Sequence, residues 1–276
     1  MIHSLAGATI VTPDLDAAIA AYRDYLGYRG VAPAVVGDAL AAAWGTPVAA
    51  GARMAVLRPE SGEARFIRLV EGIAAPDFRP LASLGWTAIE IVVQDLQALA
   101  ERLANSPFRI IGPPAVLDFD FTDAISAMQV VGPGGEILYL TQIDGVIPGF
   151  DLPVARSFVG QLFIMVLASV DIADAAGFYA GQAARVGPTI ASRIAILSAA
   201  YGLSADRRHD LATIALEERS LIEIDAFPAA VVARQASTIG LPSGIAMVSM
   251  HTRSPQSCPA VVIGGVGEWI EMLAGR

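Results

Sequence analysis

The sequence predicts an α+β protein built from four βαβββ modules in tandem, the last of them degenerate. The first observation is the stretch 8–28, ATIVTPDLDAAIAAYRDYLGY, in which an apolar strand turns sharply into an amphipathic helix. The second is that this pattern returns around Asp95 and Asp171 with its spacing preserved. The third is that each copy continues as short apolar strands separated by tight turns.

The first module is predicted over residues 1–75. Thr12 suits a helix N-cap, Pro13 suits the first helical position, and Asp14 and Asp16 favour the positive end of the helix dipole. Gly27 is expected to end this helix. An Ala-rich helix and two strands follow, predicted over residues 38–44, 53–58 and 64–70.

The second module is predicted over residues 82–145. It begins with a strand, and Asp95 is expected to cap its helix. The predicted strands cover residues 86–93, 108–111, 124–131 and 136–142, and the helix covers residues 96–103. The connector DGVIPGFDLP at 144–153 is rich in Gly and Pro, which predicts a boundary between a first half, 1–145, and a second half, 154–276.

The second half repeats the first, as a third module over 154–230 and a truncated fourth over 240–276. LGWTAIEIVVQD (84–95) matches LPSGIAMVSMHT (241–252), and VVGPGGEILYLTQ (130–142) matches VIGGVGEWIEMLA (262–274) about 25 residues too early. The fourth module is therefore expected to lack its helix and one strand. Trp44 and Tyr201 lie at equivalent positions and are expected to be core wedges.

Composition excludes several classes of function. The net charge of −9 argues against a nucleic-acid partner, and no uninterrupted apolar run is long enough for a membrane helix. The chain contains no lysine, which excludes Schiff-base chemistry and a P-loop, and Cys258 is expected to be an ordinary thiol in a loop. We expect a cytoplasmic protein, monomeric or homodimeric, with a small-molecule ligand and no nucleic-acid or membrane partner.

The opening VTPDLDAAIAAYRDYLGY and the strand-ending turns GPGGEILYL and VGEWIEML resemble the vicinal oxygen chelate superfamily, which includes glyoxalase I, bleomycin-resistance proteins and extradiol dioxygenases. The resemblance covers most of the chain. It implies that modules pair and curl into two cup-shaped mixed sheets, with the ligand inside a cup. It does not specify an activity, because the superfamily includes metal-dependent enzymes, metal-independent proteins and pure binders.

The resemblance also implies where metal ligands would lie. The usual His, seven residues before the Asp that opens each helix, is replaced in the four modules by Gly7, Ala88, Ile164 and Ile245. The usual Glu on each last strand is matched by Arg68, Tyr139, Glu223 and Glu271. Because a protein-held divalent metal needs three or four N/O ligands together, we expect no cofactor. The alternative is a metal in the second cup, bound by Glu223, Glu271 and His251.

The first cup, from the first two modules, is the favoured working site. Glu90 stands on the otherwise apolar strand TAIEIVV, and a buried carboxylate needs a partner, for which Arg68 is the obvious choice. The Arg68–Glu90 pair is either a structural tie or a catalytic acid/base pair, with Tyr139 as a hydrogen-bond donor. The side chains on the same strand faces, expected to contact the ligand, are Thr9, Trp86, Val92 and His3.

Three functions remain open from the sequence. The first is a metal-independent lyase or isomerase that moves a proton on a small apolar or aromatic metabolite with Glu90, Arg68 and Tyr139. The second is a non-catalytic protein that binds or sequesters such a molecule. The third is a metal-dependent dioxygenase or glyoxalase-type lyase. Asp118, Asp120 and Asp123 do not fit an EF-hand and are expected on a loop beside the cup.

Overall fold

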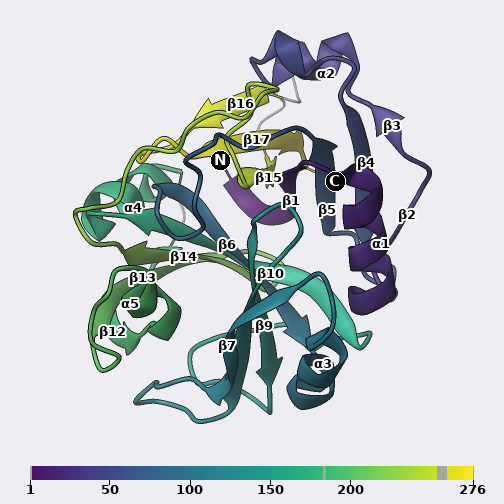
Figure 1. Ribbon diagram of the computed structural model, residues 1–276. Coiled ribbons are helices and arrows are strands. Elements are labelled where there is room, and N and C mark those ends of the chain that lie inside the picture. Colours follow the sequence, from purple (N-terminus) through teal and green to yellow (C-terminus); the bar gives the residue numbers. More distant parts are fainter. Residues whose placement is uncertain (1, 183–184, 254–259, 276) are drawn as a thin grey trace.

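Two mixed β-sheets form the framework of the computed structural model, which describes residues 2–182, 185–253 and 260–275 (Figure 1). Strand–helix–strand modules supply both sheets, so the predicted α+β class with paired, curled mixed sheets is confirmed. Cys258 and its predicted loop lie outside the described residues.

Modules one and four form the first sheet. Its described strands lie in the order β16 (Ala260–Ile263), β17 (Trp269–Ala274), β15 (Ile245–Thr252), β1 (Ile2–Thr12), β5 (Phe66–Glu71), β4 (Arg53–Arg58) and β2 (Arg29–Gly30), with β3 (Ala34–Val35) also paired to β4. The two modules join where β1 pairs antiparallel with β15, while each module keeps one internal parallel pair, β1 with β5 and β15 with β17.

Modules two and three form the second sheet. Its described strands lie in the order β11 (Arg185–Val186), β13 (Arg208–Leu216), β14 (Ser220–Ala226), β10 (Val159–Ser169), β6 (Gly85–Val93), β9 (Ile137–Ile143), β8 (Ile125–Val131) and β7 (Arg109–Val116), with β12 (Ile190–Arg193) also paired to β13. The same pattern recurs here: β6 and β10 join the modules antiparallel, and the internal pairs β6–β9 and β10–β14 are parallel.

The pairing of modules differs from the expectation. We expected the first two modules to share one cup, and that arrangement is wrong, because module one shares its sheet with module four and module two with module three. Figure 1 shows this as purple N-terminal strands beside yellow C-terminal ones. The connector at 144–153 therefore joins two modules of the same sheet. Its role as a boundary between the halves stays a prediction.

Three of the helices are capped at their N-terminus by an aspartate in the turn that follows a strand. Asp14, Asp95 and Asp171 cap α1 (Leu15–Leu26), α3 (Leu96–Leu103) and α4 (Ile172–Ala180), each accepting a hydrogen bond from a first-turn amide at 2.9, 2.9 and 3.1 Å. The predicted Thr12 cap is wrong, because Thr12 is still in β1, paired with Glu71. No helix in the described ranges has the length and apolarity needed to cross a lipid bilayer.

Buried tyrosine–glutamate bonds tie consecutive modules together. The Tyr22 hydroxyl on α1 donates to Glu136 Oε1 at 2.7 Å, in the turn before β9. The Tyr179 hydroxyl on α4 donates to Glu268 Oε1, also at 2.7 Å, in the turn before β17. Both glutamates come directly from the matched turn motifs of the sequence. Each half of the chain thus links its own two modules through a helix, while the sheets link modules across the halves.

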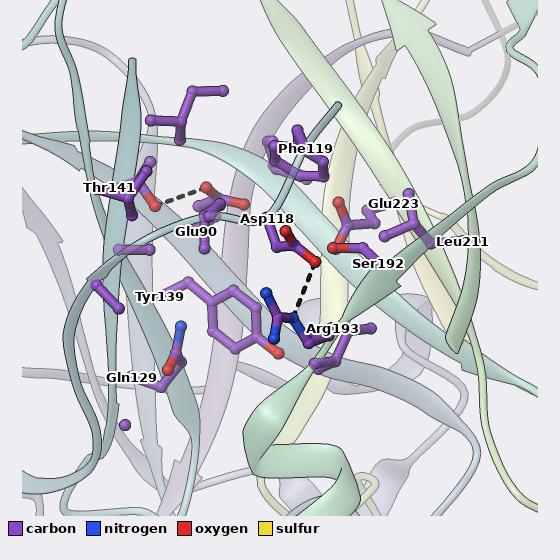
Figure 2. A pocket seen from close by; sticks show the side chains of 18 of the residues that line it. Glu90, Asp118, Phe119, Gln129, Tyr139, Thr141, Ser192, Arg193, Leu211 and Glu223 are labelled. Atoms are coloured by element: carbon purple, nitrogen blue, oxygen red, sulfur yellow. Dashed lines mark hydrogen bonds and ion pairs between the residues drawn. The ribbon is translucent and has the colours of Figure 1, made fainter. Parts of the chain in front are cut away.

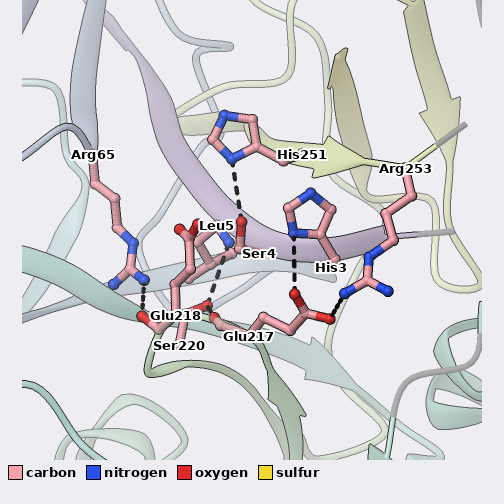
Figure 3. Close-up of polar contacts among 9 residues, drawn as sticks. All are labelled: His3, Ser4, Leu5, Arg65, Glu217, Glu218, Ser220, His251 and Arg253. Carbon is pink, nitrogen blue, oxygen red and sulfur yellow. Dashed lines mark hydrogen bonds and ion pairs between the residues drawn. The ribbon is translucent and has the colours of Figure 1, made fainter. Parts of the chain in front are cut away.

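The two sheets are joined at β1 (Figure 3). The Leu5 amide on β1 donates to the Ser220 hydroxyl on β14 at 3.4 Å, as Figure 3 shows. The Glu217 amide, in the β13–β14 turn, donates to the His3 carbonyl at 2.6 Å. The Arg65 guanidinium donates to the carbonyls of Leu162, at 3.0 Å, and of Glu218. An apolar core cluster runs across the joint and includes side chains of both sheets, among them Ile10, Leu69, Ile89, Met165 and Val248. Its burial is the main stabilising contribution at this joint.

Candidate functional site

The concave face of the second sheet holds a cavity of about 430 Å³ between modules two and three. This volume is in the range of small-molecule sites in proteins. Most of the wall is apolar, and a few polar side chains converge on it (Figure 2). The residues that carry the argument below and line this cavity are Glu90, Gln129, Tyr139, Thr141, Arg193 and Glu223.

Glu90 stands in the middle of β6 and is only 6% exposed. Its Oε1 accepts a hydrogen bond of 2.6 Å from the Thr141 hydroxyl on the neighbouring strand β9. Burial, and secondly the nearby negative charge of Glu223, raise the pKa of Glu90 to about 8, against the opposing effect of the Thr141 bond. Glu90 is therefore mostly protonated at neutral pH and can donate a hydrogen bond.

Glu223 enters the cavity from β14, on the opposite side of the space from Glu90 (Figure 2). Burial raises its pKa to about 7, and a hydrogen bond with Asp225 lowers it in part. Asp225 lies two residues along the same strand face and is 1% exposed, and burial raises its pKa well above the usual value. Two carboxylates cannot bond each other directly, so Asp225 donates its proton to Glu223.

Tyr139 lies beside Glu90 in the register of β9 and β6, and beside Gln129 on β8. Burial, and then the charges of Asp225, Glu223 and Glu90, raise the pKa of the Tyr139 phenol well above its usual value. The phenol is therefore protonated throughout the physiological range. It supplies a hydrogen-bond donor to the same cavity as the carboxyl groups.

The rim of the cavity combines an ion pair with aromatic rings. Asp118 Oδ2, on the loop after β7, accepts bonds from Arg193 Nε at 2.9 Å and from Arg208 Nη2 at 2.8 Å, which links module two to module three. Phe119, Phe121 and Phe150 stack in series with ring centroids 5.2 and 5.9 Å apart. Asp118 lines the cavity, which agrees with the expectation that its loop lies beside a cup.

The corresponding space in the first sheet is occupied by side chains. Trp44, which follows α2 (Asp38–Ala43), donates from Nε1 to Glu271 Oε1 at 2.7 Å. Arg68 Nη1 donates to Glu271 Oε2 at 3.0 Å and to Thr9 Oγ1 at 3.2 Å, and the Ser249 hydroxyl donates to Glu271 as well. Arg68 and Glu271 lie at the two positions of this sheet where the resemblance to the superfamily implies a metal-binding Glu, and they form an ion pair with each other.

The two wedge residues explain why the cup of the first sheet (modules one and four, from here on the first cup) differs from the cup of the second sheet (modules two and three, the second cup). Trp44 is 1% exposed and fills the first cup. Its equivalent Tyr201, which follows α5 (Ala195–Ala200), is half-buried and packs edge-on against Phe227 with ring centroids 6.2 Å apart. The smaller and less deeply placed ring leaves the second cup open. The prediction of a core wedge is therefore confirmed for Trp44 only.

The structure brings Glu90 and Tyr139 together but not Arg68. The expected Arg68–Glu90 pair is wrong, because Arg68 lies on β5 of the other sheet and pairs with Glu271. The bonding partner of Glu90 is Thr141. The error follows from the assumed pairing of modules one and two. The cavity lies between modules two and three, and the expectation of a working site between modules one and two is also wrong.

None of the four expected ligand-contacting residues lines this cavity. Thr9 and His3 are on β1 of the first sheet, where Thr9 bonds Arg68 and His3 stacks on His251. The register shift between β6 and β10 turns Trp86 away into the core between the sheets, where its Nε1 donates to the Trp269 carbonyl at 2.8 Å. Val92 packs in an apolar cluster with Phe163 and Ile164, which border the cavity.

The metal alternative also fails geometrically, because Glu223 is in the second sheet while Glu271 and His251 are in the first. At the superfamily's ligand positions, the second cup offers Ala88, Ile164, Tyr139 and Glu223, a donor set without imidazole that does not fit a divalent metal. Among the described residues, no group of three or more His, Cys, Asp or Glu side chains is placed to hold a metal ion.

Sequence reasoning missed Thr141 and Gln129, which line the cavity, and Asp225, which bonds to the cavity residue Glu223. Thr141 is two residues from Tyr139, and Asp225 is two residues from Glu223, so strand periodicity alone places each on the strand face of its neighbour. Gln129 lies opposite Tyr139 on β8, and predicting it requires the strand register. Strand periodicity could therefore have identified Thr141 and Asp225 from the sequence, whereas Gln129 could not have been identified in this way.

Comparison with known proteins supports the fold and not an activity. No protein-family model and no curated protein matches the sequence. Among solved structures, glyoxalase I from Zea mays is 14% identical, with a TM-score of 0.61 over 98% of this chain and 92% of that one. A putative dioxygenase from Bacillus subtilis is 11% identical, with a TM-score of 0.57 over 98% of this chain and 84% of that one. The chain therefore has the four-module fold of the glyoxalase and dioxygenase proteins, that of the vicinal oxygen chelate superfamily.

Proposed function

We propose that the chain binds a small apolar or aromatic metabolite in the cavity of the second sheet and moves a proton on it without a metal, as a lyase or isomerase. The observation that carries the proposal is the pair Glu90 and Glu223, two buried carboxyl groups with raised pKa values in one apolar cavity. Carboxyl groups tuned to near neutral pH are suited to general acid–base catalysis.

The geometry supports distinct roles for the polar groups. Glu223, with its pKa of about 7, is the base that removes a proton from carbon next to a carbonyl group. Glu90, with its pKa of about 8, and the Tyr139 hydroxyl donate hydrogen bonds to the enolate oxygen that forms. Thr141 holds Glu90 Oε1, which leaves Oε2 to carry the proton. Where a C=C bond is conjugated with the enolate, return of the proton from Glu223 to the γ-carbon shifts the double bond and completes an isomerisation.

A test substrate must be apolar and carry an acidic C–H bond. Phenylacetone in D₂O is suitable, because loss of its α-proton signal in ¹H NMR reports proton removal directly. We expect protein-dependent exchange, and a reduction of about 10²–10⁴-fold in its rate for Glu223→Gln. Glu101→Gln, an exposed glutamate on α3, removes the same charge far from the cavity and serves as the matched control.

The exchange rate should also depend on pH. It requires an ionised Glu223 and a protonated Glu90, so we expect a maximum between about pH 7 and 8, with the two apparent pKa values belonging to the pair. Binding of phenylacetone without any exchange would contradict the catalytic part and support the second candidate, a protein that sequesters its ligand. The observation that favours this second candidate is the largely apolar cavity of about 430 Å³, because such a cavity can bind a ligand without any chemical step.

A further inference from the structure

The acidic floor of the cavity lacks a positive partner. The floor consists of two carboxyl groups that line the cavity, Glu90 on β6 and Glu223 on β14, with Asp225 beside Glu223 on the same strand face but outside the lining. Within the described ranges no arginine or histidine forms an ion pair with any of the three. In the described part of the chain, the side-chain donor to Glu90 is the neutral Thr141 hydroxyl. Elsewhere in the chain the buried Glu271 has a guanidinium partner. Buried acids without a cation are costly for the protein alone.

A second observation is an unused hydrogen-bonding oxygen next to the floor. Asp225 is 1% exposed, and its Oδ1 has no hydrogen-bond partner among the described residues. Asp225 shares the strand face of Glu223, and it is among the acids that raise the pKa of the Tyr139 phenol, which lines the cavity. Unsatisfied buried oxygens are rare in native proteins, and this one adds an unbalanced acid beside the cavity-lining Glu223.

The walls select against a bare metal ion and for an organic cation. The cavity is lined by aromatic rings, including Phe119, Phe121, Tyr139 and Phe163, and ring faces attract cations. At the rim, Arg193 and Arg208 share the carboxylate of Asp118, and Arg193 also lies 3.7 Å from Asp206, so two carboxylates balance the two guanidinium groups. Once Glu223 is ionised, above about pH 7, the floor therefore carries the net charge that a ligand meets.

We infer that the cavity takes an apolar molecule bearing one positive charge, a hydrophobic amine or quaternary ammonium ion, with its cationic group between Glu90 and Glu223 and its apolar body against the aromatic wall. This inference rests on the function proposed above and specifies its ligand class. With such a ligand, one carboxylate balances the positive charge while the other stays available for proton transfer.

Two molecules of nearly equal shape isolate the effect of charge. Benzyltrimethylammonium carries a permanent positive charge, and neopentylbenzene replaces its nitrogen by carbon. Ligand-detected NMR titration of the full chain at pH 8.5 should give a dissociation constant for the cation about tenfold or more below that for the neutral molecule. Equal affinities, or tighter binding of neopentylbenzene, would overturn the inference and leave the proposed apolar site intact. Binding of neither molecule would contradict both.

The pH dependence gives an independent readout. At pH 6 Glu90 and Glu223 are both protonated, so binding of the cation must release a proton, whereas at pH 8.5 a carboxylate is already present. Affinity for benzyltrimethylammonium should therefore rise by up to about tenfold per pH unit from pH 6 and level off above pH 8. Affinity for neopentylbenzene should not rise. The other charged or titratable groups that line the cavity are Asp118, Arg193 and Tyr139, and Asp225 lies beside Glu223 on the same strand face.

Variants locate the charge effect. Glu90→Gln and Glu223→Gln should each weaken the cation at pH 8.5 by about tenfold and leave neopentylbenzene within about twofold. Retained binding of the neutral molecule shows that the variant is folded. Glu101→Gln has the same change in net charge and should alter neither affinity. A loss of cation affinity in Glu101→Gln equal to that in Glu90→Gln would overturn the inference, since the effect would then be long-range.

Discussion

Glu90 illustrates how one residue can make stability depend on pH. Its pKa of about 8 in the folded protein exceeds the ordinary value of 4.5, because burial disfavours the ionised form. A group with a raised folded-state pKa contributes its full stability below the unfolded pKa and loses it as the pH rises through the folded pKa. The loss from Glu90 therefore falls between about pH 4.5 and 8.

Glu90→Gln removes this ionisation and keeps the acceptor for Thr141. We expect the variant to match the wild-type free energy of unfolding at pH 5 and to exceed it at pH 9 by on the order of 1–3 kcal/mol, since one pKa unit corresponds to about 1.4 kcal/mol. Urea denaturation at both pH values measures this. An equal difference between the two proteins at pH 5 and 9 would contradict it, and Glu101→Gln is the control.

Arg68 and Glu271 belong to a structural network and not to the ligand site. Glu271 is fully buried and accepts from Arg68, Trp44 and Ser249, so removing one partner leaves a buried charge uncompensated. Glu271→Met and Arg68→Met should each lower the free energy of unfolding by about 3–5 kcal/mol, and the double variant Arg68→Met/Glu271→Met should recover most of that loss. Strictly additive effects in this double-mutant cycle would show that the two side chains do not interact.

The helices after β3 and β12 determine which cup is open. Trp44→Ala removes a buried indole from the first cup and should destabilise the protein by about 3–5 kcal/mol, whereas Tyr201→Ala removes a half-buried ring and should cost clearly less. Urea denaturation of both variants tests the difference. Equal losses would contradict the assignment of Trp44 as the filler of its cup.

Local elements were largely predictable because their signals are local. The helix Leu96–Leu103 and the strand Arg53–Arg58 have the predicted bounds, since Asp95 and the alternating apolar pattern act within a few residues. The helix after β1 was placed too early, because the β1–β5 ladder continues through Thr12 and overrides its capping preference. Tertiary pairing decided that boundary.

At the scale of the molecule, the sequence repeat does not determine which modules share a sheet. Glu90, Tyr139 and Glu223 were each singled out from the sequence, yet their convergence depends on the β6–β10 pairing between modules two and three. Similar modules present similar edge strands, so the pairing is selected by contacts far apart in the chain. The Arg68–Glu90 hypothesis failed for this reason.

This crossed pairing predicts how fragments behave. Because each sheet takes one module from each half, residues 1–145 and 154–276 should not form folded monomers separately, as each would expose the unpaired strands β1 and β6, or β10 and β15. Mixed together, the fragments should restore the native circular dichroism spectrum and cooperative unfolding. A folded, monomeric 1–145 fragment would contradict the arrangement.

The central claim is that the cup between modules two and three is the ligand site, while the other cup is filled. A crystal structure of the full chain with benzyltrimethylammonium tests it most directly. The account predicts the trimethylammonium group between the carboxyl groups of Glu90 and Glu223, with the ring against the aromatic wall. Ligand density beside Arg68 and Glu271 in the first cup, with the second cup empty, would contradict it.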